Sequence, residues 1–107
     1  MSLDFYLYKT KRVAIFDRNI THNLTTMASK AGIYEALWCP EKINATYARD
    51  IIPILKKGFA DLLARPEYFK QFDSPNGWGL YVHFLPFVES VLRACEQDPD
   101  AEIEVSV

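Results

Sequence analysis

The residues best suited to chemistry form one polar run, Asp17–Asn23, which combines a histidine with carboxylate, amide and hydroxyl side chains. If Thr21 caps a helix that begins here, free backbone amides face outward at the positive end of the helix dipole. Such amides bind anions or carboxylates. The same residue types also serve only as helix caps, so a purely structural role stays open. The run predicts a candidate site for a small polar or anionic ligand, made by Asp17, Asn19, Thr21, His22 and Asn23.

A second run, Asn76–Gly79, places a tryptophan between two glycines. The glycines let the backbone approach another surface closely, which leaves the Trp78 indole free to cover a pocket or stack on a ligand. The alternative, favoured by the usual burial of large aromatic side chains, is that Trp78 plugs the end of the core. If the loop lies against His22, then Asn76 and Trp78 complete a polar cleft with the first run.

Catalysis is the alternative function of the first run. His22 could act as a general base at neutral pH, helped by Asp17, Ser29 or Ser74, in a small hydrolase or transferase. The sequence contains neither a nucleophile elbow nor a Cys–His signature, and no glycine-rich phosphate loop. We therefore assign no catalytic residue and treat a binding role as the main prediction.

Metal binding depends on two histidines and two cysteines that lie far apart in the chain, His22, His83, Cys39 and Cys95. Structural zinc sites usually take their ligands in close pairs such as C-x-x-C, and no such pair is present. We predict no metal site and no cofactor. The cysteines lie in apolar surroundings, which is typical of buried free thiols in a reducing compartment.

Composition narrows the class of protein. The chain has 107 residues, of which 50% are hydrophobic, and its formal net charge is -2. This length and apolar content predict a single domain over residues 1–107 that needs no metal or disulfide. The basic residues Lys9, Lys11 and Arg12 lie near Tyr6 and Tyr8, but the overall acidic balance makes nucleic acid an unlikely partner. These basic residues are more typical of a solvated turn.

The N-terminus lacks the basic and apolar regions of a secretory signal, and no apolar run approaches the roughly 20 residues of a membrane span. These features predict a cytoplasmic protein with no membrane partner.

Alternating apolar residues predict three strands. Leu3–Tyr8 and Val13–Phe16 form a hairpin, with Val13 and Ile15 on the core face and Asp17 as the end of the second strand. The tail 101–107 also alternates and forms the third strand, in an order that the pattern leaves open.

Helical spacing predicts the remaining elements. A helix from Thr21 ends at Gly32, which suits a left-handed C′ residue. Further helices are expected over 33–38, 44–65, 66–72 and 81–98. We expect a kink at Pro53, and Pro86 either kinks the last helix or marks its true start. The expected fold is α+β, with a small three-stranded sheet, from an N-terminal hairpin and a C-terminal strand, packed against three to five helices.

The motifs Asn19-Ile20-Thr21-His22-Asn23 and Asn76-Gly77-Trp78-Gly79, with the closing Pro99-Asp100-Ala101-Glu102-Ile103, resemble those of a family of small uncharacterised proteins of bacteriophages and bacteria. The likeness runs over nearly the whole chain. It implies a compact α+β domain and a phage-linked origin, and it assigns no catalytic residue.

Surplus aromatic residues indicate an interaction protein. The chain has six tyrosines, seven phenylalanines and two tryptophans, more than the apolar stripes require. Some of them, such as Tyr6, Tyr8, Tyr47 or Tyr68, are expected at the surface, where aromatic patches mark interfaces. The main prediction is therefore a binding or interaction module, whose partner is a protein or a small polar or anionic ligand.

Overall fold

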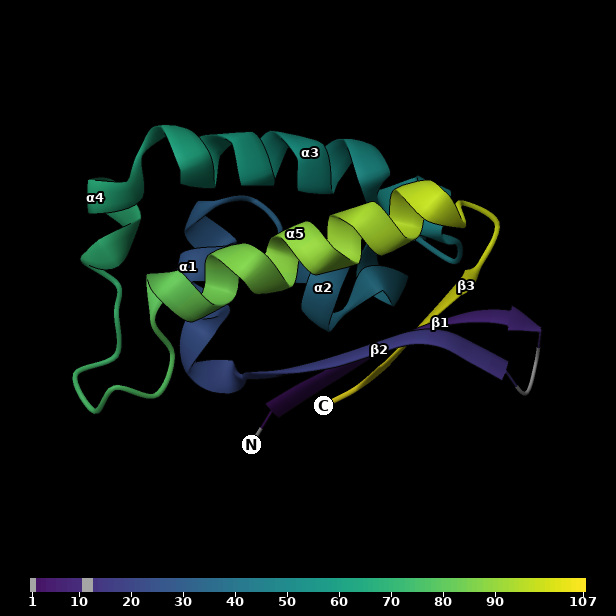
Figure 1. The fold of residues 1–107 in the computed structure, drawn as a ribbon, viewed down its shortest axis with the longest axis horizontal. Helices are drawn as coiled ribbons and strands as arrows, with labels where there is room; N and C mark the ends of the chain where they lie inside the picture. Colours follow the sequence, from purple (N-terminus) through teal and green to yellow (C-terminus); the bar gives the residue numbers. More distant parts are fainter. Residues whose placement is uncertain (1, 11–12) are drawn as a thin grey trace.

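The computed structural model describes residues 2–10 and 13–107. In this part of the chain, five α-helices lie on one face of a three-stranded antiparallel sheet (Figure 1). The predicted α+β fold, with its N-terminal hairpin and C-terminal strand, is confirmed. The predicted turn residues Lys11 and Arg12 lie outside the described residues. Among the described helices, none combines the length and apolar character that crossing a membrane requires.

The sheet is built around the first strand. Strands β1 (Ser2–Thr10), β2 (Val13–Thr21) and β3 (Glu102–Ser106) have the order β2-β1-β3, and β1 pairs antiparallel with both neighbours. Alternation along β1 turns Leu3, Phe5 and Leu7 into the core, where all three are fully buried. β1 alternates regularly between core-facing and outward-facing side chains. It is paired on both sides and one of its faces is buried, which specifies its register strongly.

Strand β2 differs from the prediction in length and in facing. It continues beyond Asp17 to Thr21, so the predicted end at Asp17 is wrong. The pairing shifts between Leu7, which lies opposite Phe16, and Tyr8, which lies opposite Ala14. The extra residue, Ile15, forms a bulge that moves the alternation by one position. Consequently Phe16 packs against the core, and Ile15, predicted to face the core, is 38% exposed.

The predicted helices are present with altered bounds. Gly32 has φ +76° after the first helix, as expected for a left-handed C′ residue. The described helices are the 3-10 turns η1 (His22–Leu24) and η2 (Pro40–Ile43), and the α-helices α1 (Thr25–Lys30), α2 (Tyr34–Trp38), α3 (Ala48–Ala64), α4 (Pro66–Lys70) and α5 (Tyr81–Gln97).

Helix α3 begins at Ala48, four residues later than predicted. The segment around this start hydrogen-bonds with the C-terminal segment instead: Ile103 N donates to Thr46 O, and Ala48 N donates to Ala101 O. Asp50 then accepts from the amides of Thr46 and Tyr47 at 3.0 and 2.9 Å. These two bonds stabilise the carboxylate and hold the pKa of Asp50 below its usual value.

Helix α5 lies next to β2, and α3 packs along α5 on the side farther from the sheet (Figure 1). Pro53 and Pro86 lie inside them, and each helix continues through its proline. The core between helices and sheet is apolar, and its largest fully buried side chains are Leu3, Phe5, Leu7, Leu24, Met27, Ile33, Leu37, Ile51, Leu55, Leu62, Phe69 and Phe84.

The two cysteines are free and buried, as the sequence predicts. Burial raises the pKa of the Cys95 thiol to about 12 and also raises the pKa of Cys39. Because the thiolate is the reactive form, both thiols should react with Ellman's reagent at neutral pH far more slowly in the native protein than after denaturation. Cys39, which is 8% exposed, should react before Cys95, which is fully buried. Rapid reaction of Cys95 in the native protein would contradict this placement.

Candidate functional site

The loop between α4 and α5 is closed at its base by two hydrogen bonds. Tyr81 N, at the start of α5, donates to Asp73 Oδ1 at 2.7 Å, so the carboxylate satisfies a free amide of the helix terminus. Ser74 N donates to Gly79 O at 3.1 Å. The loop therefore leaves and re-enters the helical layer at fixed points.

The tip of the loop is held by an asparagine. Asn76 Oδ1 accepts from Ser74 Oγ at 2.6 Å and from Trp78 N at 2.9 Å. These bonds fix the backbone of Trp78 without using its side chain. The indole is 71% exposed, so Trp78 is not a plug for the core, which was the role favoured by its size.

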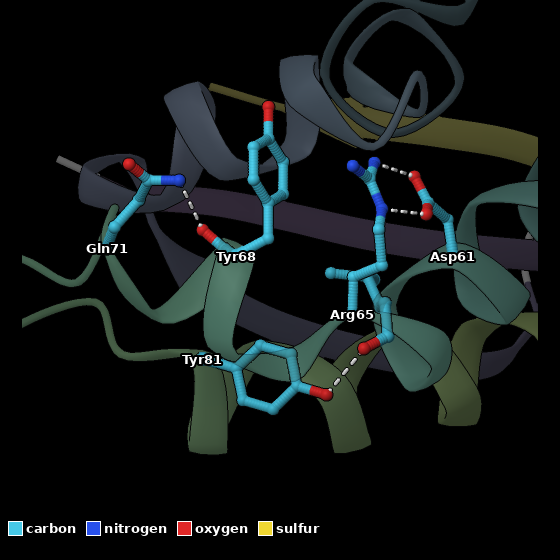
Figure 2. Close-up of polar contacts among 6 residues, drawn as sticks. Asp61, Arg65, Tyr68, Gln71 and Tyr81 are labelled. Atoms are coloured by element: carbon cyan, nitrogen blue, oxygen red, sulfur yellow. Dashed lines mark hydrogen bonds and ion pairs between the residues drawn. The ribbon is translucent and has the colours of Figure 1, made fainter.

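Tyr81 anchors this loop to the helices. Its hydroxyl donates to Leu62 O near the end of α3 at 2.6 Å (Figure 2), and burial raises its pKa. Beside it, Arg65 pairs with both carboxylate oxygens of Asp61 and lies 4.2 Å from the centre of the Tyr68 ring. The start of α5 is thereby tied to the end of α3.

Replacing Tyr81 by phenylalanine should lower the free energy of unfolding by about 1–3 kcal/mol, because it leaves the buried Leu62 carbonyl without a donor. Tyr68→Phe is the matched control, since its hydroxyl makes no hydrogen bond among the residues drawn in Figure 2. Urea denaturation of the two variants measures the difference. Equal stability of both would show that the Tyr81 bond contributes nothing.

The loop also rests on the junction between β2 and η1. Asn23 Nδ2 donates to Trp78 O at 2.7 Å. Thr21 Oγ1 accepts from Asn23 N at 3.3 Å, which caps η1 and places the Asn23 side chain toward the loop. The two polar runs of the sequence are therefore in contact, through Asn23 and Trp78.

Gly79 is required at this contact. A Cβ there would lie 2.8 Å from Asn23 Cβ and 3.3 Å from Thr21 Cγ2, and its φ is +111°. Gly77 has φ +80° but open space around it. Gly79→Ala should therefore destabilise the protein by about 1–3 kcal/mol more than Gly77→Ala, since both strain the backbone but only the former overpacks. Thermal denaturation measures the difference, and equal melting temperatures would contradict the docking of the loop on Asn23.

A groove follows from this arrangement. A cavity of about 430 Å³ lies against the loop and is lined by Asn19, Ile20, Thr21, Gly77, Trp78, Gly79 and His83. A second cavity of about 350 Å³ shares Asn19, Ile20 and His83, and adds Arg18, Pro86, Phe87 and Ser90. The two cavities share three lining residues and lie along β2 and α5, and we name them together the β2–α5 groove.

Arg18 gives the groove a positive charge that no acidic side chain in the described part of the chain balances. Arg18 lies opposite Phe5, a core residue, and so faces the helical side of the sheet, where its guanidinium lies 5.4 Å from the centre of the Phe16 ring. Within residues 2–10 and 13–107, no carboxylate forms an ion pair with Arg18. No acidic residue lines either cavity. The groove therefore favours a negatively charged group near Arg18.

The predicted site residues divide between the groove and other places. Asn19, Thr21 and Trp78 line it, and Asn23 supports it. The Asn19 amide also donates to Ser2 Oγ at 2.9 Å and Asp4 Oδ1 at 2.6 Å. Asn76 acts within the loop. Asp17 lies opposite Tyr6 on the outer face of the sheet and lines neither cavity.

His22 is directed elsewhere. Its Nε2 is buried without a hydrogen-bond partner, and its ring meets the Trp38 ring edge-on with centroids 6.2 Å apart. His22 is absent from the lining of the groove, where His83 lies beside Trp78 instead. A general base must reach the proton that it removes, so the sealed Nε2 does not favour a catalytic role.

Sequence reasoning missed the contribution of α5. His83, Pro86, Phe87 and Ser90 recur at helical spacing and therefore share one face. This periodicity was available as a signal, although nothing in it indicates that the face borders β2. Among the described residues, no group of three His, Cys, Asp or Glu side chains could hold a metal ion.

Comparisons with protein-family models, with curated proteins and with solved structures gave no match for this chain. The resemblance to small phage and bacterial proteins consequently stays a prediction.

Proposed function

We propose that this protein is an interaction module that holds a segment of a partner protein in the β2–α5 groove, with Trp78 as the principal contact. The observation that carries the proposal is the 71% exposed indole on a loop whose backbone is fixed by its own hydrogen bonds. Exposed tryptophans at the edge of a groove are typical of binding hot spots.

The fixed loop lowers the cost of binding. Asn76, Asn23 and Asp73 hold the loop before any partner arrives, so little backbone order remains to be imposed on association. Preorganisation of this kind increases affinity because less conformational entropy is lost.

Two other functions are less well supported. A small hydrolase or transferase with His22 as its base is not favoured by the placement of this residue, because its Nε2 is buried and the side chain lines neither cavity of the groove. A small polar or anionic ligand is compatible with the volume of either cavity, but both cavities are open to solvent and would leave much of such a ligand exposed.

Peptide selection followed by NMR tests the proposal. A displayed library of random short peptides is selected against the protein, and the strongest binder is titrated into ¹⁵N-labelled protein. The proposal expects chemical-shift changes at residues 18–21, 77–79 and 83–90. Failure to select any peptide, or changes confined to α1 and β3, would overturn it.

A thermal-shift panel run in parallel distinguishes binding of a small ligand from binding of a partner segment. Inorganic phosphate, nucleotides, sugars and amino acids are added to the protein and to Trp78→Ala. A rise in melting temperature that is lost in the variant, together with no selected peptide, would assign the groove to a small ligand instead.

A further inference from the structure

We infer that the partner binds as an extended strand that pairs with the free edge of β2 and so adds a fourth strand to the sheet. This inference rests on the proposed function and specifies the conformation and charge pattern of the partner. Strand β2 is at the edge of the order β2-β1-β3. Within the described residues, nothing pairs with its outer side, and a free edge is a template for strand addition.

The other edge of the sheet is already protected. Tyr47 forms a bridge with Glu102 on the outer side of β3, and Ile103 N donates to Thr46 O at 2.9 Å. The bulge at Ile15 interrupts the first part of β2, whereas pairing with β1 is regular from Phe16 to Thr21. The stretch Phe16–Thr21 is therefore the regular edge available for an added strand.

The groove lies where an added strand would pass. Helix α5 runs along β2 in the opposite direction, since Trp78 and His83 lie by Ile20 and Thr21 while Ser90 lies by Arg18. Figure 1 shows α5 above β2 on the helical side of the sheet. Every second side chain of a strand added to β2 would point toward α5, and the others toward the outer face. The groove would therefore hold alternate residues of the partner.

The charges on β2 specify what these residues should be. Arg18 faces the helical side without a carboxylate partner, so the partner residue directly opposite it should be acidic. Asp17 faces the outer side, so the residue opposite it should be basic. Because Asp17 and Arg18 are neighbours in β2, the two partner residues opposite them are also neighbours in the partner's sequence. The favoured partner thus carries an acidic residue next to a basic one within an extended segment.

The same charges disfavour a second copy of this chain as the occupant. If two β2 strands paired antiparallel about Asp17 or about Arg18, the central charge would face its own copy, and like charges directly opposite destabilise a strand pair. In registers centred on Phe16 or Asn19, Arg18 would face Ala14 or Ile20, neither of which supplies the complementary charge. The partner is therefore assigned to another protein. Sedimentation of the protein alone should show a monomer. A dimer whose contact maps to Phe16–Thr21 would overturn the assignment.

Backbone methylation tests the extended conformation. The selected peptide is remade with a single N-methyl group at each position in turn. A paired strand should lose about tenfold or more in affinity at every second position, where an amide donates to β2, and little at the positions between. A loss with helical periodicity, or none, would overturn the inference while leaving the groove as the binding site. Selection of no peptide would overturn both proposals.

Charge reversal tests the specificity. Arg18→Glu should weaken the selected peptide about tenfold, and a peptide whose acidic residue is replaced by lysine should recover the affinity for the variant. Lys57→Glu is the matched control, because Lys57 is an exposed cation on α3 and lines neither cavity. Equal effects of the two reversals, or no recovery with the exchanged peptide, would overturn the assigned charge pattern.

Discussion

Replacing Trp78 by alanine is expected to weaken binding of the selected peptide by at least about thirtyfold. Truncation of a hot-spot tryptophan typically costs about 2 kcal/mol or more, which corresponds to that factor. Because the indole is 71% exposed in the free protein, its removal uncovers little of the core. The melting temperature should therefore remain nearly unchanged. Calorimetric titration of the peptide and thermal denaturation measure the two quantities.

Leu63→Ala is the matched control for this variant. Leu63 is 53% exposed on α3 and lines neither cavity, so its truncation removes an exposed apolar side chain outside the groove. It should leave the peptide affinity unchanged. If Trp78→Ala binds as tightly as Leu63→Ala, the indole is not a contact. A large fall in the melting temperature of Trp78→Ala would instead indicate that the side chain supports the fold.

The second large effect concerns Gly58, which is buried inside α3. A Cβ at Gly58 overlaps the Ile33 Cγ2 methyl and lies 3.0 Å from the Ala31 carbonyl oxygen. Helix propensity alone predicts that Gly58→Ala stabilises the protein by about 1 kcal/mol. We expect the opposite sign, a loss of about 1–3 kcal/mol, because Ile33 is fully buried and cannot move aside. Urea denaturation gives the sign directly.

A double-mutant cycle with Ile33→Ala isolates the contact. Ile33→Ala removes the methyl group that Gly58→Ala would overlap, so Gly58→Ala should cost less in that background than in the wild type. Ala60→Gly, on the exposed side of the same helix, gives the propensity effect without the contact. Additive effects of Gly58→Ala and Ile33→Ala would mean that the two positions do not collide.

Much of the fold could be predicted because strong patterns agree with the tertiary structure. Alternation in β1 and the apolar stripes of α3 and α5 all face the core. The extension of β2 to Thr21 could not be predicted, since Asp17–Thr21 is polar and is held in the sheet by its pairing with β1. The late start of α3 has a similar cause, because Thr46 and Ala48 hydrogen-bond with the C-terminal segment.

The candidate site was predictable in part. Asn19, Thr21, Asn23 and Trp78 do meet, since polar runs with turn-forming residues tend to lie at the surface where elements join. The direction of His22 depends on the geometry of η1 and on the position of Trp38, neither of which follows from spacing. The role of α5 depends on which strand forms the edge of the sheet, and only the three-dimensional arrangement shows that.

The most direct test of the account is amide hydrogen exchange along β2, measured by NMR without and with the selected peptide. In the free protein, the outward-facing amides between Phe16 and Thr21 should exchange rapidly, because within the described residues no strand covers them. The account predicts that alternate amides in this stretch become protected when the peptide binds. Unchanged exchange throughout β2 in a saturated complex would contradict it.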